Sequence, residues 1–485
     1  MSAKLHKIDE LSKLLDDKNE LAGNLMDLYR HFNLSQAMAS CKITKLTGVS
    51  CSLLMLFLIL SRLMSISKYQ LYRHHYLDLA EEEIGKNSMY RFVNNPRFNW
   101  RSLLYAVVKS FFKNLNKALE KSGTTSEGKK TPTFFVMDDT TLSKTGIAME
   151  NISRVFDHTV HKCILGFKCL TLGFFDGKSL LPVDFALLCE KGKKGKYGLT
   201  AKEIKGRFHK QRDPHSQGCK RDKESRMSKI DLALSILRRV CKHGYHADYF
   251  LADSWFDGIE FIKQIREMAN GSMHVICMVK NGNRKYSCDG RMRTVGELIA
   301  LYGRTAKPCR KYKCLYFDRL VEVDGLNMRL FFVKYGHKGK WNILLSTDTM
   351  LKFTKVFEYY QVRWTTEVMY RECKQHLGLG KCQSNDFDAQ IADCTLVFIT
   401  YTMMTLRKRL NDYESYGALF REMGEEIGEM TLWQRILPLV KKLLMTLCEV
   451  LGVDYLETME SIVESPEREN RICAVIRALD MQDAA

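Results

Sequence analysis

The sequence predicts a multidomain α/β protein in which a helical N-terminal region precedes a core of alternating strands and helices. Three observations support this prediction. The chain has 485 residues, which is long enough for two to four domains. Hydrophobic residues make up 45% of it, so the chain can bury a sizeable core. Near residue 131 the hydrophobic pattern changes from helical spacing to short apolar runs bounded by turn residues.

The chain is strongly basic, which indicates a polyanionic partner. It holds 75 Lys and Arg against 56 Asp and Glu, a net charge of +19. Nucleic acid and an anionic membrane surface both fit such a charge. The most apolar run, residues 53–60, ends at Ser61 and Arg62 and is far shorter than the roughly 20 residues of a spanning helix. We therefore expect a nucleic acid partner and no membrane.

The N-terminus and the cysteines bear on the compartment. The first twenty residues carry acids and lack an apolar signal core, which argues against secretion. The 16 cysteines include no paired CxxC set, so we interpret them as reduced thiols rather than zinc ligands. The expected location is the cytoplasm.

Residues 1–130 are predicted to form a helical DNA-binding region. The helix expected at residues 53–63 is too apolar for a DNA groove and belongs in the core. A better candidate is Lys86–Val93, which offers Lys86, Asn87 and Arg91 beside an apolar side and resembles a helix-turn-helix recognition helix. The alternative is an ordinary solvated amphipathic helix.

Residues 131–283 are predicted to form the first part of a mixed sheet flanked by helices. Asp176-Gly177 is a hairpin signal between two of its strands. The expected strands are 133–137, 164–175, 179–188, 249–252 and 274–279, and the expected helices are 230–243 and 256–269.

Within this part, residues 191–229 form a basic segment with 14 Lys and Arg against 4 Asp and Glu. We expect a mobile loop that can hold phosphates beside an active site. A merely solvated loop is the alternative.

The rest of the chain divides into three parts. Residues 284–347 are strand-rich, with a hairpin signal at Asp324-Gly325, and are predicted to form a β-rich insertion. Residues 348–410 complete the core and begin with a long helix at 351–379. Residues 411–485 are predicted to be a helical C-terminal region with a possible role in multimerisation.

Acidic residues follow two of the predicted strands. Asp138 and Asp139 end the first strand, and Asp253 follows the strand at 249–252. The carboxyl end of a strand is a usual place for a site in an α/β sheet. A single Asp there is weak evidence, because Asp also caps helices and turns.

A third position lies on the helix at 351–379. At about 100° per residue, five side chains fall on one stripe of this helix. They are Tyr360, Arg363, Glu367, Arg371 and Lys374. Such a stripe would make a poor core face, and a solvated face with salt bridges is the alternative.

Together these residues resemble a known family. Tyr360-x2-Arg363-x3-Glu367-x6-Lys374 is similar to the Tyr-Arg-Glu-Lys signature of a group of bacterial insertion-sequence DDE transposases. Asp139-Thr140-Thr141 resembles the first catalytic segment of that family, and residues 250–253 resemble the second. The resemblance covers about residues 131–410 and implies a ribonuclease H-like core interrupted by the β-rich insertion.

The resemblance also implies a chemistry. Asp139, Asp253 and Glu367 would be the catalytic carboxylates and would bind two Mg²⁺ ions, with Mn²⁺ as a possible substitute. Asp138 is the rival of Asp139, since neighbours on a strand point to opposite faces. The expected reaction is cleavage at the ends of the element, followed by attack of the 3′-hydroxyl on target DNA.

The expected partner is double-stranded DNA, both the terminal inverted repeats and the target. The resemblance implies phosphate contacts from the signature helix, a homodimer that pairs the two ends, and a bacterial, nucleoid-associated location. No small-molecule substrate is expected. The predicted DNA-binding residues are Tyr360, Arg363, Arg371, Lys374, Trp341, Lys144, Lys86, Asn87 and Arg91.

Two other functions stay open. A ribonuclease H-like nuclease would use the same carboxylates to cut DNA without strand transfer. A transposase-derived DNA-binding protein would bind without cutting, and this reading predicts a damaged set of carboxylates.

Overall fold

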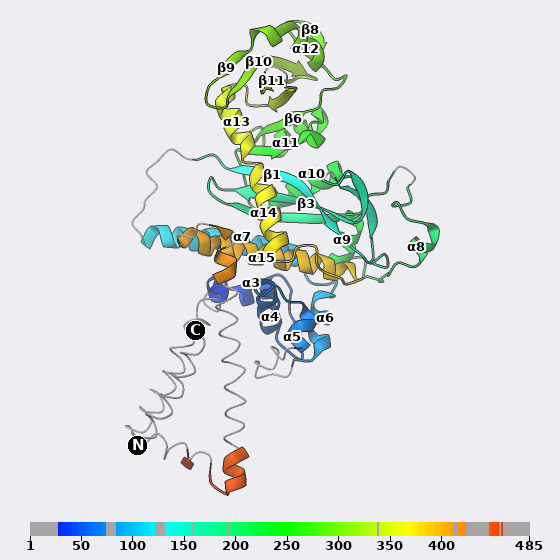
Figure 1. Cartoon of the computed structure of the whole chain (residues 1–485), viewed down its shortest axis with the longest axis vertical. Helices are drawn as coiled ribbons and strands as arrows, with labels where there is room; N and C mark the ends of the chain where they lie inside the picture. Colours follow the sequence, from blue (N-terminus) through cyan, green and yellow to red (C-terminus); the bar gives the residue numbers. More distant parts are fainter. Residues whose placement is uncertain are drawn as a thin grey trace.

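The computed structural model describes residues 28–73, 84–121, 131–157, 159–192, 195–336, 339–411, 415–416, 418–422, 446–454 and 457–458. In these residues a mixed α/β core has helices of the N-terminal region at one end and a strand-rich part at the other (Figure 1). The predicted α/β class is confirmed. The expectations for residues 1–27 and for most of 411–485 lie outside the described residues.

The described N-terminal region has three short helices packed on an apolar helix, α4 (Cys51–Leu63), and one long helix, α7 (Trp100–Lys121). The short helices are α3 (Leu34–Ser40), α5 (Lys68–Arg73) and α6 (Lys86–Val93). Ser50 caps α4, and the helix buries most of its residues, as its composition predicts. Helix α6 has the predicted bounds and buries Met89, Phe92 and Val93.

The core sheet combines antiparallel and parallel strands. Its strands are β1 (Phe134–Ser143), β2 (Ser153–Asp157), β3 (Lys162–Phe175), β4 (Leu180–Leu188), β5 (Tyr249–Ala252) and β6 (His274–Val279). Strand β1 pairs antiparallel with β3 and parallel with β5, and β5 pairs parallel with β6. The hairpin between β3 and β4 turns at Asp176-Gly177, where Gly177 has a φ of 96° that suits glycine.

Strand β1 is longer than predicted, which changes where its acidic residues lie. Its parallel pairing with β5 ends at Met137 opposite Ala252, but its antiparallel pairing with β3 continues to Ser143. Asp138 and Asp139 are therefore inside a strand rather than at its end. They project beyond the shorter neighbour β5, at the carboxyl edge of the parallel strands.

Helices cover both faces of the core sheet. On one face, Phe250 of β5 packs against Phe261 of α11 (Ile259–Met268), next to α10 (Lys229–Lys242). On the other face, Tyr249 packs against Tyr359 of α13 (Phe353–Gln361). This second face also holds α14 (Trp364–His376) and α15 (Phe387–Leu410), and α14 crosses the sheet in front of β1 (Figure 1).

The strand-rich part extends the same sheet. Its elements are β7 (Lys285–Cys288), β8 (Arg291–Thr294), α12 (Val295–Tyr302), β9 (Lys307–Cys309), β10 (Cys314–Val323), β11 (Leu326–Lys334) and β12 (Trp341–Ser346). Strand β12 pairs antiparallel with β6, so core and insertion share one sheet of 12 strands. Asp324 and Gly325 both have positive φ in the predicted hairpin turn.

The helix predicted at 351–379 is divided in two at Val362 and Arg363. Around this point the backbone N–H groups of Arg363 and Thr366 bond to carbonyls three residues earlier, which tightens the turn. The hydroxyl of Thr365 also donates to the carbonyl of Val362 at 2.7 Å. Arg363 therefore lies at the junction of α13 and α14.

The basic segment is not the unstructured loop that its charge predicted. It contains the short helices α8 (Ala201–Lys205) and α9 (Gln217–Glu224). Lys210 Nζ lies 2.8 Å from Asp386 and 2.9 Å from Asp388, and Arg212 bonds to Glu150. Several of its cations are thus used to attach the segment to the core.

Helix α15 passes through the interior. By length and composition it could cross a membrane, but its apolar stretch is wholly buried inside the protein. This burial identifies α15 as a core helix.

A buried carboxylate in β4 joins two other elements, α7 and α10. Asp184 is fully buried and accepts from Tyr105 at 2.7 Å, from Arg101 at 3.1 Å and from Arg239 Nη2 at 3.1 Å. Burial alone would raise the pKa of Asp184, but the guanidinium groups hold it well below its usual range.

Removing this charge is expected to destabilise the fold. Asp184→Asn leaves buried arginines without their partner and should lower the free energy of unfolding by about 3–5 kcal/mol near neutral pH. The contribution of Asp184 is present above about pH 4 and is lost as the pH falls, because the folded pKa is depressed. Urea unfolding at neutral and acidic pH measures both effects. Glu358→Gln, whose carboxylate pairs with the exposed Lys311 and Lys355, is the control and should cost about 1 kcal/mol or less. If Asp184→Asn and Glu358→Gln lower the free energy of unfolding equally, the buried charge of Asp184 has no special role in stability.

Candidate active site

Two acidic residues follow paired positions at the carboxyl edge of β1 and β5. Because Met137 is in register with Ala252, the next residues, Asp138 and Asp253, are neighbours across the two parallel strands. In-register residues of adjacent strands point to the same face. Asp253 also caps a short 3-10 helix, where its side chain accepts from the backbone N–H of Trp255 at 2.9 Å.

Helix α14 lies on the face to which Asp138 points. Thr366 Oγ1 donates to Asp138 Oδ2 at 2.9 Å, and the hydroxyl of Tyr370 donates to the Asp138 carbonyl at 2.9 Å. Further along, Lys374 Nζ donates to Thr140 Oγ1 at 2.7 Å. The alternation along β1 places Asp138 and Thr140 on this one face.

Arg363 joins the first strand to the glutamate of α14. Its Nη1 lies 2.7 Å from Asp138 Oδ2, and its Nη2 lies 2.9 Å from Glu367 Oε1. The Glu367 side chain is half exposed, whereas Asp138 is largely buried. One guanidinium therefore gathers two of the acidic side chains around a positive charge.

Asp139 points to the opposite face of β1. It forms ion pairs with Lys168 of β3, at 3.5 Å, and with Lys229, which begins α10. Lys168 also donates to Thr141 Oγ1 at 3.0 Å, so the alternate residues of β1 serve this second face. The expectation that Asp139 lies with Glu367 is not supported, because Asp138 occupies that position.

The two neighbouring carboxyls have opposite electrostatic environments. Burial raises the pKa of Asp138 to about 6, although Arg363 opposes the shift. Burial would also raise the pKa of Asp139, but Lys229 and Lys168 outweigh it and keep that pKa below its usual value. Nearby cations therefore outweigh the cost of burying the charge at Asp139 but not at Asp138.

The other residues of the predicted stripe differ in accessibility. Tyr360 is buried in α13, and its hydroxyl has no hydrogen-bond partner among the described residues. Burial raises its pKa, and the negative charge of Asp253 adds to the shift, whereas Arg363 opposes it. Arg371 is exposed, whereas Lys374 is half-buried, and burial lowers the pKa of Lys374.

Two of the residues predicted to contact DNA, Lys144 and Trp341, make contacts within the protein instead. Lys144 is buried and donates to the carbonyls of Gly380 and Cys382, both at 2.7 Å. Its ammonium is therefore not available to DNA in this conformation, which corrects the prediction. Trp341 is partly buried against Phe317 in the insertion, with ring centroids 5.2 Å apart.

Lys86, Asn87 and Arg91 lie exposed on α6, as a groove contact requires. Lys86 Nζ lies 5.1 Å from the ring centroid of Tyr69. Their contact with DNA bases stays a prediction.

Sequence reasoning missed the residues that hold the site together. Thr366 and Tyr370 fix Asp138 against α14, and Lys168 and Lys229 neutralise Asp139. The spacing of Arg363, Thr366 and Tyr370 on one helical face was a usable signal for the first pair. Lys168 and Lys229 come from distant segments, and local sequence gives no indication of their pairing.

The donor set on the Asp138 face suits a hard divalent cation. Asp138, Asp253 and Glu367 offer carboxylate oxygens, which such cations prefer. Two of them already converge on one positive group, Arg363. In this conformation no three His, Cys, Asp or Glu side chains of the described part of the chain are grouped closely enough to hold a metal ion. Cation binding therefore requires Asp138 and Glu367 to separate from Arg363.

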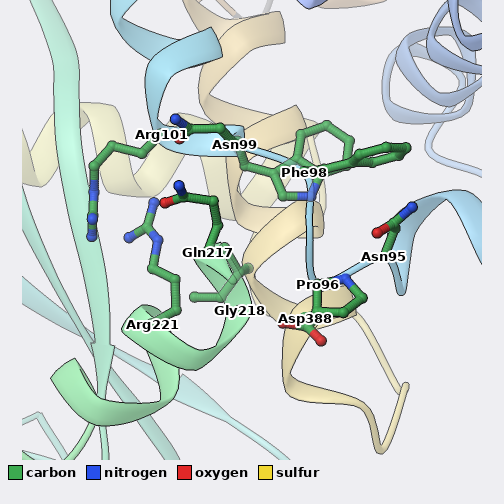
Figure 2. A pocket seen from close by; sticks show the side chains of 11 residues that line it. Asn95, Pro96, Phe98, Asn99, Arg101, Gln217, Gly218, Arg221 and Asp388 are labelled. Carbon is green, nitrogen blue, oxygen red and sulfur yellow. The ribbon is translucent and has the colours of Figure 1, made fainter. Parts of the chain in front are cut away.

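A separate pocket lies between the N-terminal helices and the core. In Figure 2 the side chains of Arg101 and Arg221 lie on one side of it and Asp388 on another. Gly218 is required there, because a Cβ would come within 2.3 Å of Asp388 Oδ1. The pocket contains none of the three candidate carboxylates, so we interpret it as a joint between the two regions.

Part of the chain is similar to a known protein family. Residues 176–403 match the family model of the transposase DDE domain. The match supports a DDE transposase family, a class of DNA-cleaving enzymes that generally use divalent metal ions. It includes Asp253 and Glu367 and begins after β1. The large mixed sheet is consistent with a ribonuclease H-like transposase domain. No curated protein matches the chain.

The contrast between Asp138 and Asp139 predicts opposite effects on stability. The folded pKa of Asp138 is raised, so its charge costs stability as the pH rises from about 4 to above 6. Asp138→Asn removes this cost, and its stability relative to the wild type should improve by about 2–3 kcal/mol between pH 4 and pH 7. Asp139→Asn should lose relative stability over the same range, because the folded pKa of Asp139 is depressed and its lysines would lack their partner. Urea unfolding in chelator measures both differences. If the stability of both variants relative to the wild type changes in the same direction as the pH rises, the assignment of Asp138 and Asp139 to opposite faces of β1 is refuted.

Proposed function

We propose that this protein is a transposase that cleaves the ends of its own insertion sequence and joins the 3′-hydroxyl to target DNA. The observation that carries the proposal is the placement of Asp138 and Asp253 directly after paired residues of β1 and β5, with the Glu367 helix bonded to Asp138. Residues 176–403 also match the transposase DDE domain. The high positive charge supports a DNA substrate.

The proposed catalytic residues are Asp138, Asp253 and Glu367. Asp138 replaces Asp139 in this set because its carboxylate contacts Arg363 and Thr366 on the Glu367 face. We assign Asp139 to the opposite face, where it anchors Lys168 and Lys229.

The three carboxylates are also the proposed ligands of divalent cations, Mg²⁺ or Mn²⁺, two per site. When bound, such ions activate a water or a 3′-hydroxyl and stabilise the leaving oxygen. The raised pKa of Asp138 fits this role, since a buried carboxylate that lacks full compensation favours a cation. Thr366 and Tyr370 orient Asp138 through its side chain and its carbonyl.

The remaining signature residues would hold DNA phosphates. Arg363 carries a positive charge at the edge of the site, and Arg371 is exposed one turn beyond Glu367. Lys374 is held by Thr140 and Thr141 at the far end of the same stripe. Tyr360 places an unpartnered hydroxyl near Asp253, where a phosphate oxygen could accept it.

The remaining parts of the proposal concern how two ends are held. The N-terminal helices, with Lys86, Asn87 and Arg91 exposed on α6, would bind the terminal inverted repeats. Trp341 is the candidate aromatic contact from the insertion. A homodimer would bring the two ends together.

The direct test of the function is DNA cleavage. Labelled duplex from the sequence that flanks the gene is incubated with purified protein and Mg²⁺, Mn²⁺ or chelator. Asp138→Asn, Asp253→Asn and Glu367→Gln should each reduce metal-dependent cleavage by more than about 100-fold, because even outer partners of metal ligands typically contribute 10- to 100-fold. DNA binding should persist in all three variants.

Asp139→Asn is the matched control and should keep the larger part of the cleavage activity. If cleavage is instead lost in Asp139→Asn and kept in Asp138→Asn, Asp139 is the catalytic residue and Asp138 is not. Cleavage without any joined product would favour a nuclease, and binding without cleavage would favour a derived DNA-binding protein.

The phosphate contacts predict a change in salt dependence. Arg371→Gln removes one exposed charge and should reduce the slope of log affinity against log salt by about 0.9 for duplex DNA. Lys144→Met is the control because its ammonium is buried against two carbonyls, so its slope should equal that of the wild type. Fluorescence anisotropy over a range of salt concentrations measures the slopes, and identical slopes for Arg371→Gln and the wild type would refute the contact.

A further inference from the structure

An exposed tryptophan lies at the same edge of the sheet, on the side opposite Arg363. Trp255 follows Asp253 by two residues, and 52% of its surface is exposed. The Nζ atoms of Lys229 and Lys280 lie 5.2 and 4.7 Å from its ring centroid. Single exposed hydrophobic side chains are common on protein surfaces, and Trp364 is exposed as well. Trp255 differs from Trp364 because two lysine ammonium groups lie over its ring.

The two lysines beside Trp255 are held in different ways. Lys229 is fixed by its ion pair with Asp139, which lies next to Lys168. Lys280 directly follows β6, is exposed, and has no ion pair with an acidic side chain among the described residues. Trp255 therefore has one anchored cation and one cation that is free to move.

We propose that Trp255, Lys229 and Lys280 form a platform for an unpaired DNA base and its adjacent phosphates. This inference rests on the proposed function and adds a strand-holding subsite to it. The base stacks on the indole, and Lys280 moves from the ring to a phosphate. Stacking of a base on an aromatic ring is stronger than an exposed cation–π contact, so the exchange is favourable.

The position of the platform fits a strand that leaves the reaction centre. Asp253 accepts from the backbone N–H of Trp255, so the indole is tied to one of the candidate catalytic carboxylates. Asp139 then acquires a positioning role, because it holds Lys229 against the tryptophan and does not face Glu367. With Asp253 included, the lysines Lys168, Lys229 and Lys280 still outnumber the two aspartates of the group, Asp139 and Asp253, as a DNA strand requires.

The test uses DNA binding in chelator, so that no cleavage is needed. The probes are a fully paired duplex and the same duplex with a few unpaired 3′ nucleotides, one of them 2-aminopurine. Trp255→Ala should weaken binding of the unpaired end by about 5- to 100-fold and leave binding of the paired duplex nearly unchanged. Trp255→Phe should retain most of the affinity. The 2-aminopurine fluorescence should be quenched by the wild type and not by Trp255→Ala.

A second variant tests the phosphate contact. Lys280→Gln should reduce the salt slope for the unpaired end by about 0.7. Lys178→Gln is the matched control, because Lys178 is exposed on the turn between β3 and β4 at the opposite edge of the sheet. Tyr335→Ala is the control for loss of an exposed aromatic ring.

The outcomes separate this inference from the function itself. If the wild type binds and cleaves DNA but Trp255→Ala binds the unpaired end equally well and 2-aminopurine is quenched in neither protein, the platform is refuted and the transposase stands. If the wild type binds neither probe, both proposals fail. If Trp255→Ala is poorly folded, two measurements still test the platform. They are the quenching of 2-aminopurine by the wild type and the salt dependence with which Lys280→Gln binds the unpaired end.

Discussion

The parallel pairing of β1 with β5 is the constraint on which the candidate active site depends. Its register sets Asp138 beside Asp253 without any contribution from side-chain packing. The pairing stops at Met137 and Ala252, so the two carboxylates emerge where β5 ends and β1 continues along β3. A slip of one residue in this register would send Asp138 to the opposite face and remove it from the Glu367 helix.

The same alternation explains why two adjacent aspartates have different roles. Asp138 shares its face with α14, where Arg363, Thr366 and Tyr370 contact it. Asp139 shares the other face with Lys168 and Lys229. A buried carboxylate without a cation is costly, and each aspartate has acquired one. The difference lies in the number and the attachment of the cations, since Arg363 is divided between Asp138 and Glu367.

Much of the fold follows from local sequence, because short apolar runs and turn residues define their own strands. The strands Tyr249–Ala252 and His274–Val279 and the helix Lys86–Val93 have the predicted bounds. Asp253 and Glu367 could be selected from strand ends and helix spacing alone. Their common site is still a matter of tertiary structure, because it depends on the β1–β5 register.

The predictions that were wrong concern residues whose structure depends on contacts with distant segments of the chain. β1 extends past its apolar run because β3 supplies hydrogen-bond partners for Asp138, Asp139 and the residues after them. The basic segment is ordered because Glu150, Asp386 and Asp388 lie where Lys210 and Arg212 can reach them. Lys144 is buried by the carbonyls of residues 380 and 382, more than two hundred positions away. Local composition contains none of this information.

The two faces of the sheet at the carboxyl edge would have different roles in the proposed reaction. On the α14 side, acidic groups are available to cations once Arg363 gives up its bonds to Asp138 and Glu367, and its guanidinium would then be free for a phosphate. On the α10 side, Asp139 is saturated by lysines and contributes no free charge, so that face attracts the DNA backbone and offers the indole of Trp255 for a base. Asp253 connects the two sides, with its carboxylate near Tyr360 and its hydrogen bond to the Trp255 backbone. A strand that crosses this edge would therefore meet metal-binding groups on one side and a stacking surface on the other, so that cleavage and retention of the cut end would depend on separate residues.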